Sequence, residues 1–163
     1  MSTRGIIIAV VTILIAVSGV RAEDGLGVGV IVGEPTGISI KKWISQEHAL
    51  DAALAWSFSG NDSFQFHMDY LIHNFKLLKV DAKNGQLPVY FGIGGRVKLK
   101  DNQNDKNHNN NDPQIGVRVP FGICYLFAEQ PLEIFAEIVP ILDVVPDTDF
   151  DINAAIGIRY YFR

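Results

Sequence analysis

The chain has 163 residues, of which 48% are hydrophobic and 20% charged, so its length suits one domain and its composition excludes a disordered protein. A formal net charge of -4 argues against nucleic acid as a partner, because nucleic-acid-binding domains carry a basic patch or stripe. The single cysteine, Cys124, excludes an intramolecular disulfide.

The N-terminal segment has the pattern of an export signal. A positive residue, Arg4, precedes the apolar run 5–17, and residues 20–22 fit the small-residue rule for a cleavage site. The run is shorter than the roughly 20 apolar residues that a spanning helix needs, so we expect cleavage after this site rather than a retained anchor. The sequence therefore predicts a signal peptide at 1–22 and a mature domain at 23–163.

In the mature chain, apolar side chains recur at every second position, which is the period of a half-buried β-strand. This alternation predicts eight strands, at 26–32, 38–44, 49–58, 64–73, 89–99, 115–127, 132–139 and 150–162. The Asn84-Gly85 pair between the fourth and fifth strands is a hairpin signal. Consecutive strands joined by short links pair antiparallel, and closure removes the open edges of a sheet. The expected fold is therefore all-β: an eight-stranded antiparallel up-and-down barrel.

Alternation alone does not say which face of the barrel is inside. A soluble periplasmic lipocalin-like carrier would turn its apolar face toward a ligand, whereas a transmembrane barrel turns that face toward lipid. Glycine and alanine occupy many positions of the other face, which suits the narrow centre of an eight-stranded barrel. Aromatic residues near strand ends resemble interfacial girdles: Trp43, Trp56, Phe58, Tyr125, Phe127, Tyr160 and Phe162. The sequence therefore favours a transmembrane β-barrel.

Charged residues of both signs fall on the small-residue face, so we expect them inside the barrel. A buried charge is costly unless it is paired and hydrogen-bonded, and the near-balance of signs therefore predicts an interior ion-pair network. Its expected members are Lys41, Asp51, His67, Asp69, Arg96, Lys98, Arg118, Glu133, Glu137, Asp151 and Arg159. Because Arg118 and Glu137 lie on consecutive strands, we expect contact between them.

Over its whole mature length the chain resembles the small eight-stranded outer-membrane β-barrel proteins of Gram-negative-type bacteria. Its ending resembles the C-terminal signal by which the outer-membrane assembly machinery takes up such barrels. The residues of this ending are Ile156, Ile158, Tyr160 and Phe162, followed by Arg163, which the family pattern usually lacks. The resemblance implies a protein of the bacterial outer membrane, with outer-membrane lipid and the assembly machinery as partners.

The even number of strands places both ends of the mature chain on the periplasmic side. The Asn-rich loop 101–114 then faces outward, as long loops of such barrels do. The link 73–88 faces the periplasm, where connections are usually short. This long periplasmic link departs from the family pattern.

No catalytic or metal site is expected. Ser57, His67 and Asp69 share a face, but a tight hairpin would set Ser57 opposite Gln65 rather than beside the histidine. The Asn-rich loop lacks the glycine and glutamate of an EF-hand, and the histidines show no metal-ligand spacing. The resemblance implies that barrels which modify lipid A carry catalytic His and Ser residues on the face toward lipid. On the lipid face of this chain we expect neither residue.

Three classes of function follow from this sequence. The favoured class is a structural or interaction protein with a plugged, charged interior, and no enzyme activity or cofactor is expected. The alternative is a narrow porin-like channel or a small-ligand-binding barrel, including the soluble carrier described above. An enzyme acting on lipid is the third class.

Overall fold

The computed structural model describes residues 25–57, 63–78, 84–100 and 113–162 of the chain. The predicted signal peptide (1–22), Phe58 and residues 101–112 of the Asn-rich loop lie outside the described residues. The strands are β1 (Leu26–Gly33), β2 (Thr36–Trp43), β3 (His48–Ser57), β4 (Ser63–Asn74), β5 (Gly85–Gln86), β6 (Val89–Lys100), β7 (Gln114–Arg118), β8 (Phe121–Phe127), β9 (Leu132–Val145) and β10 (Asp149–Phe162). Within these described ranges, no helix is long and apolar enough to cross a membrane.

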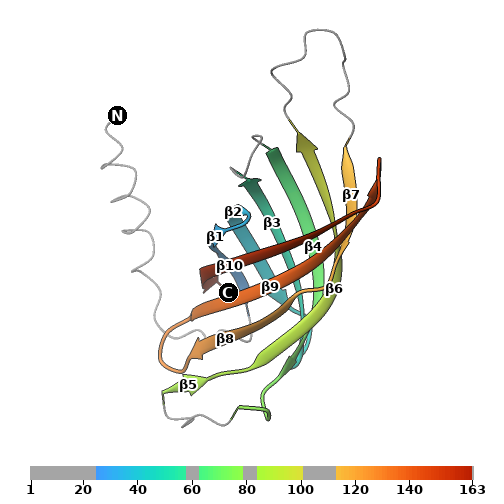
Figure 1. Cartoon of the computed structure of the whole chain (residues 1–163). Helices are drawn as coiled ribbons and strands as arrows, with labels where there is room; N and C mark the ends of the chain where they lie inside the picture. The colour runs from blue at the N-terminus through green and yellow to red at the C-terminus, as the bar shows by residue number, and fades with distance from the viewer. Residues whose placement is uncertain (1–24, 58–62, 79–83, 101–112, 163) are drawn as a thin grey trace, which may run out of the picture.

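All ten strands belong to one antiparallel sheet, which closes into a ring through eight of them (Figure 1). The order around the ring is β1, β2, β3, β4, β6, β7, β9 and β10, and β10 pairs with β1 to close it. β8 pairs with β6 and β9, the same two neighbours that β7 has, and β5 pairs with β8. The expected all-β antiparallel arrangement is therefore confirmed.

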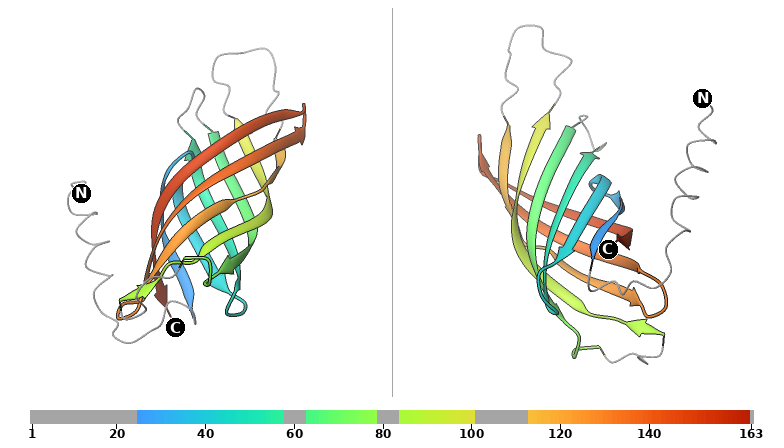
Figure 2. Two further views of the ribbon diagram at one scale, coloured as in Figure 1. Left: turned by 60° about the horizontal axis from the view of Figure 1, so that its bottom comes forward. Right: turned by 180° about the vertical axis from the view of Figure 1, so that it is seen from behind.

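The ring has two ends that differ in what they carry (Figure 2). β1 begins and β10 ends at one end, here called the terminal end, where the turn between β8 and β9 also lies. The link between β9 and β10 lies at the opposite end, here called the loop end, where β1, β3 and β6 also end. These two ends are the reference for every position given below.

The apolar face of each strand points outward. Valine and isoleucine favour strands because their branched side chains fit a pleated surface, and here many of them are exposed. Ile93 is 61% exposed and Ile156 is 62% exposed, whereas Ala53 and Ala55 on the opposite face are buried. The arrangement that a lipocalin-like carrier needs, with the apolar face around a ligand, is therefore not the one observed.

Aromatic side chains lie near both ends of the outward face. The outward pairs are Trp56–Phe64 at the loop end, with ring centroids 5.7 Å apart, and Tyr125–Phe127 (4.8 Å) and Tyr160–Phe162 (4.9 Å) at the terminal end. The assignment of Trp43 to an outward girdle was wrong. Trp43 is buried on the inward face with Lys41, because these two residues are separated by two positions in the same strand.

The sixth expected strand is divided in two. β7 ends at Arg118 and β8 begins at Phe121, so the continuous strand predicted at 115–127 was wrong at its centre. Proline has no N–H to donate to a β-ladder, which explains the break at Pro120. The carbonyl of Pro120 accepts a hydrogen bond from the Gly92 N–H at 2.9 Å, and Val119 donates to the next strand. The break is thereby bridged by backbone hydrogen bonds on both sides.

The seventh strand is longer than its pattern predicted. β9 continues past residue 139 to Val145 and pairs with β10 as far as Asp143 opposite Asp149. Pro140 lies within this strand, where its carbonyl still accepts a hydrogen bond from the Val119 N–H at 3.0 Å. The extension carries Ile141 and Asp143 inward, and both are buried.

The connection after β4 also differs from expectation. β4 runs to Asn74, whose side-chain oxygen accepts hydrogen bonds from the N–H groups of Lys76 and Leu77 at 2.9 and 3.1 Å. This local turn ends the strand. Gly85 then pairs with Phe127 of β8, which is distant in sequence, so the hairpin expected at the Asn-Gly pair was wrong.

Candidate functional site

The inward face of the ring concentrates the ionisable side chains. Nine residues of the predicted network are at most 8% exposed: Lys41, Asp51, His67, Asp69, Arg96, Arg118, Glu133, Glu137 and Arg159. The other two, Lys98 and Asp151, are partly buried. The strands bring most of these residues into three separate clusters.

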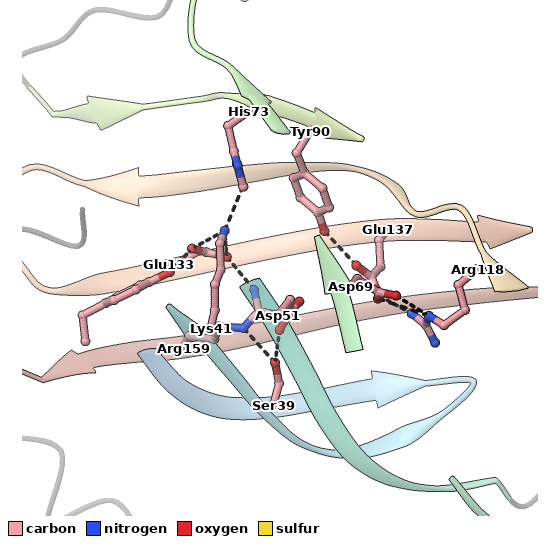
Figure 3. Close-up of polar contacts among 11 residues, drawn as sticks. Ser39, Lys41, Asp51, Asp69, His73, Tyr90, Arg118, Glu133, Glu137 and Arg159 are labelled. Carbon is pink, nitrogen blue, oxygen red and sulfur yellow. Dashed lines mark hydrogen bonds and ion pairs between the residues drawn. The ribbon is translucent and has the colours of Figure 1, made fainter. Parts of the chain in front are cut away.

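The first group, the Glu133 cluster, consists of five residues labelled in Figure 3, Ser39, Lys41, Asp51, Glu133 and Arg159, and of Tyr161. The Glu133 carboxylate accepts hydrogen bonds from Lys41 Nζ at 3.0 and 3.1 Å and from Arg159 Nη1 at 2.6 Å. The Tyr161 hydroxyl donates to the same carboxylate. Arg159 also donates to Asp51 at 2.5 Å and to Ser39 at 2.8 Å. Two cations face two carboxylates, so the formal charges of this cluster cancel.

Aromatic rings enclose the Lys41 ammonium at the terminal end. Its Nζ lies 4.5 Å from the centroid of the Trp43 ring and 5.6 Å from that of Tyr90. It also lies 3.0 Å from His73 Nε2. A cation near an aromatic face is attracted by the ring quadrupole. His73 and Tyr90 were missed as members of the network, although both follow the same alternation as the charged residues that were predicted.

The second group, the Arg118 cluster, consists of Asp69, Tyr90, Arg118 and Glu137 (Figure 3). Arg118 Nε donates to both oxygens of Asp69, at 3.0 and 3.1 Å. The predicted contact with Glu137 is present as an ion pair of 3.8 Å between Arg118 Nη2 and Glu137 Oε1. The Tyr90 hydroxyl donates to Glu137 at 2.9 Å. Neither Nη1 nor Nη2 of Arg118 has a hydrogen-bond partner in the described part of the chain.

The third group, the Arg96 cluster, joins β6 to the extended hairpin of β9 and β10. Arg96 Nε donates to Asp143 at 2.9 Å, and its Nη1 and Nη2 donate to Asp151 at 3.2 and 3.1 Å. The Asp151 side chain is 40% exposed, so this cluster lies near the loop end. Asp143 was missed because it fell beyond the predicted end of its strand.

The register of β3 and β4 argues against a hydrolytic triad. Ser57 lies opposite Ser63, and Gln65 lies opposite Ala55, so the expected pairing of Ser57 with Gln65 was wrong by two residues. The observed register sets Trp56 beside Phe64, a pair of aromatic side chains that contact across the strands. His67 lies four residues further along β4 than Ser63 and is hydrogen-bonded to Gln65 at 3.3 Å.

His48 corrects one expectation about the outward face. Its neighbour Ala49 is buried and Leu50 is 41% exposed, so His48 faces outward at the start of β3. Its Nδ1 lies 2.9 Å from the hydroxyl of outward-facing Tyr70. The prediction that no histidine lies on the apolar face was therefore wrong.

Inward glycines leave room for the large side chains of neighbouring strands. A methyl group at Gly122 would overlap the ring of Tyr90, and one at Gly116 would overlap the Asp143 carboxylate. In an interior with little spare volume, such close approach requires a residue without a side chain. The small residues that the sequence predicts on this face thus leave the space that the large polar side chains fill.

Gly122→Ala is expected to lower the free energy of unfolding by about 1–3 kcal/mol, because the added methyl group displaces Tyr90 from Glu137. Urea unfolding of the refolded protein measures this loss. Gly95→Ala is the matched control, since its methyl group faces outward and meets only the Gly116 carbonyl oxygen at 3.7 Å. Equal stability of the two variants would contradict the close packing of the Tyr90 ring against Gly122.

The clusters have the properties of a packed interior. Each of the four cations in them is held by one or two carboxylates, and Cys124 is 1% exposed among apolar neighbours. Among the described residues, no group of three or more His, Cys, Asp or Glu side chains is arranged to hold a metal ion. The arrangement joins distant strands by charge-assisted hydrogen bonds, which are stronger than neutral ones.

Comparisons with known proteins agree with this architecture. A family model described as "Protein of unknown function (DUF3996)" matches residues 17–162. Among solved structures, the crystal structure of the N-terminal β-barrel domain of Pseudomonas aeruginosa OprF is similar, with a TM-score of 0.62 and 12% sequence identity. The alignment covers 86% of this chain and 98% of that one, so the two share a fold. No curated protein matches the sequence.

Proposed function

The chain belongs to the DUF3996 family, and from its fold and its apolar outward face we propose that it is a transmembrane β-barrel protein of the bacterial outer membrane. Its role in this proposal is structural or interactive, with a plugged, charged interior and no enzyme activity. Outer-membrane lipid surrounds the ring, and the outer-membrane assembly machinery inserts it. Residues 1–22 act as the export signal that brings the chain to that membrane.

The outward face carries this proposal. Large exposed apolar side chains cover it all around the ring, from Trp56 and Phe64 at one end to Phe162 at the other. Exposed apolar patches on soluble monomers rarely exceed a few hundred Å². A bilayer instead favours an apolar band between aromatic girdles on a closed sheet, because closure satisfies the backbone hydrogen bonds. In water, the same face would make the protein prone to aggregate.

The filled interior favours a structural role over a channel or a ligand carrier. The Glu133 and Arg118 clusters occupy the ring interior with side chains bonded to one another across it. A hollow of about 590 Å³ is lined mostly by apolar residues, among them the exposed Val32, Ile138 and Ile156, and it also touches Glu137 of the Arg118 cluster. In a bilayer, this hollow would be covered by lipid chains.

The end of β10 supports the proposed recognition by the assembly machinery. Ile156, Ile158 and Phe162 are exposed on the outward face, and Tyr160 packs beside Phe162 in the same row. These four residues present alternate side chains to one side of the terminal strand. In this proposal they form the signal that the machinery reads.

Fractionation of cells that produce the full chain tests the location, and gel migration and bilayer conductance of the purified, refolded protein test the fold and the plug. We expect the mature protein in the outer-membrane fraction, faster migration without heating than after boiling, and no stepwise conductance. A freely soluble protein would overturn the membrane assignment. A heat-modifiable protein that conducts ions steadily would retain that assignment and overturn the plugged interior.

A further inference from the structure

A small polar patch interrupts the apolar outward face near the terminal end of the ring. It consists of Lys42 on β2, His48 on β3 and Tyr70 on β4. Of the outward positions in the described strands, Lys42 is the one with a charged side chain at neutral pH. The patch lies among Leu26, Ile44 and other apolar residues, so its chemistry differs from that of its surroundings.

The strand register brings the three side chains together. Leu50 pairs with Lys42 on one side and with Tyr70 on the other, and His48 lies two residues before it on the same face. The Tyr70 hydroxyl lies 2.9 Å from His48 Nδ1, and the two ring centroids are 5.6 Å apart. The His48 carbonyl accepts hydrogen bonds from the Ile44 and Ser45 N–H groups, at 2.9 and 3.2 Å. The turn between β2 and β3 is therefore fixed, and it holds the patch in place.

Lys42 differs from its buried neighbour Lys41 in having no counter-ion. Lys41 is held by Glu133 inside the ring, whereas Lys42 is exposed and forms no ion pair within the described ranges. A lysine at a membrane interface extends its ammonium toward the headgroups. Its unpaired charge therefore attracts an anion from the lipid side.

The hydrogen bond between Tyr70 and His48 prepares a second donor. When the Tyr70 hydroxyl donates to His48 Nδ1, the neutral imidazole carries its proton on Nε2. Nε2–H then donates on the same face as the Lys42 ammonium. Phosphate oxygens accept hydrogen bonds from both kinds of group, and a charged partner strengthens each bond.

We propose that Lys42, His48 and Tyr70 form a binding site for the phosphate group of an anionic phospholipid in the leaflet at the terminal end. This inference rests on the proposed membrane location. The lipid tails continue the phosphate contact along the apolar face, beside side chains such as Ile40 and Leu50. The site is thus polar where the lipid phosphate lies and apolar where the lipid tails lie.

Native mass spectrometry tests this site with the protein refolded in phosphatidylcholine vesicles that contain a minority of phosphatidylglycerol. We expect wild-type protein to retain phosphatidylglycerol selectively, and Lys42→Gln to weaken this retention by about five-fold. Tyr70→Phe is expected to weaken it less, and Lys42→Arg to preserve it. Lys76→Gln is the matched control, since it removes the same charge from an exposed turn outside the patch.

Equal retention by wild type and Lys42→Gln would overturn the site, and so would an equal loss in Lys76→Gln, which would show a general charge effect. Heat-modifiable migration of each variant separates these outcomes from a folding defect. Absence of a heat-modifiable form of the wild type in every vesicle would instead overturn the proposed membrane barrel.

Discussion

Glu133→Leu is expected to lower the free energy of unfolding by about 3–5 kcal/mol, because it leaves buried cations without their carboxylate. Glu133 is fully buried and accepts hydrogen bonds from Lys41, Arg159 and Tyr161. Leucine fills similar volume but accepts none of them. The remaining carboxylate, Asp51, still pairs with Arg159, so Lys41 bears the main loss. Urea unfolding in vesicles measures the change.

Two further variants make this result specific to the Glu133 cluster. Glu129→Leu removes an exposed carboxylate from the turn before β9 and is expected to change stability by less than about 1 kcal/mol. Combining Lys41→Met with Glu133→Leu removes the orphaned cation and is expected to recover part of the loss, since apolar groups replace a buried pair well. A Glu133→Leu protein as stable as Glu129→Leu would contradict the assigned ion pairs.

Ile93→Arg is expected to destabilise the protein in a bilayer by about 2–4 kcal/mol, the range measured for arginine near the middle of the lipid face of membrane barrels. Ile93 lies on the outward face near the centre of β6, opposite Tyr70, whose hydroxyl reaches from there toward His48 and the terminal end. Its side chain is 61% exposed, so steric crowding contributes little to the expected loss. Urea unfolding of vesicle-refolded protein provides the measurement.

The same substitution at the edge of the apolar band is the matched control. Ile44 is 57% exposed just beyond the end of β2, at the terminal end, and Ile44→Arg is expected to cost about 0–1 kcal/mol because the charge reaches water. In a water-soluble protein, both substitutions would fall within about 0.5 kcal/mol of wild type, since both sites are exposed. Equal effects at the two positions would therefore contradict a lipid-facing band.

The sequence allowed the faces of the sheet to be predicted because strand side chains alternate with a period of two. Once Ile156 and Ile158 were assigned to one face, Arg159 had to lie on the other, and the structure buries it. The same reasoning placed Lys41 and Asp69 inside. The face on which a side chain lies depends only on its position within its own strand. It is therefore predicted correctly even where the length of the strand or its neighbours are predicted wrongly.

The partners within the interior were not predictable in this way. Arg159 meets Ser39 across the seam between the first and last strands, and Arg96 meets Asp143 through the extension of β9. Both contacts depend on ring closure and register, which alternation does not specify. Proline did not mark the ends of strands consistently. Pro140 lies inside β9, whereas Pro120 lies at the break between β7 and β8.

The pairing of β1 with β10 sets the order of events in making this protein. The two strands that close the sheet are the first and the last of the described strands in chain order, so closure has to await the synthesis of β10. Until then, one edge of each remains unpaired, and unpaired edges recruit other chains. Synthesis of β10 is therefore the step that removes both open edges, and a chain without β10 keeps the edge of β1 open.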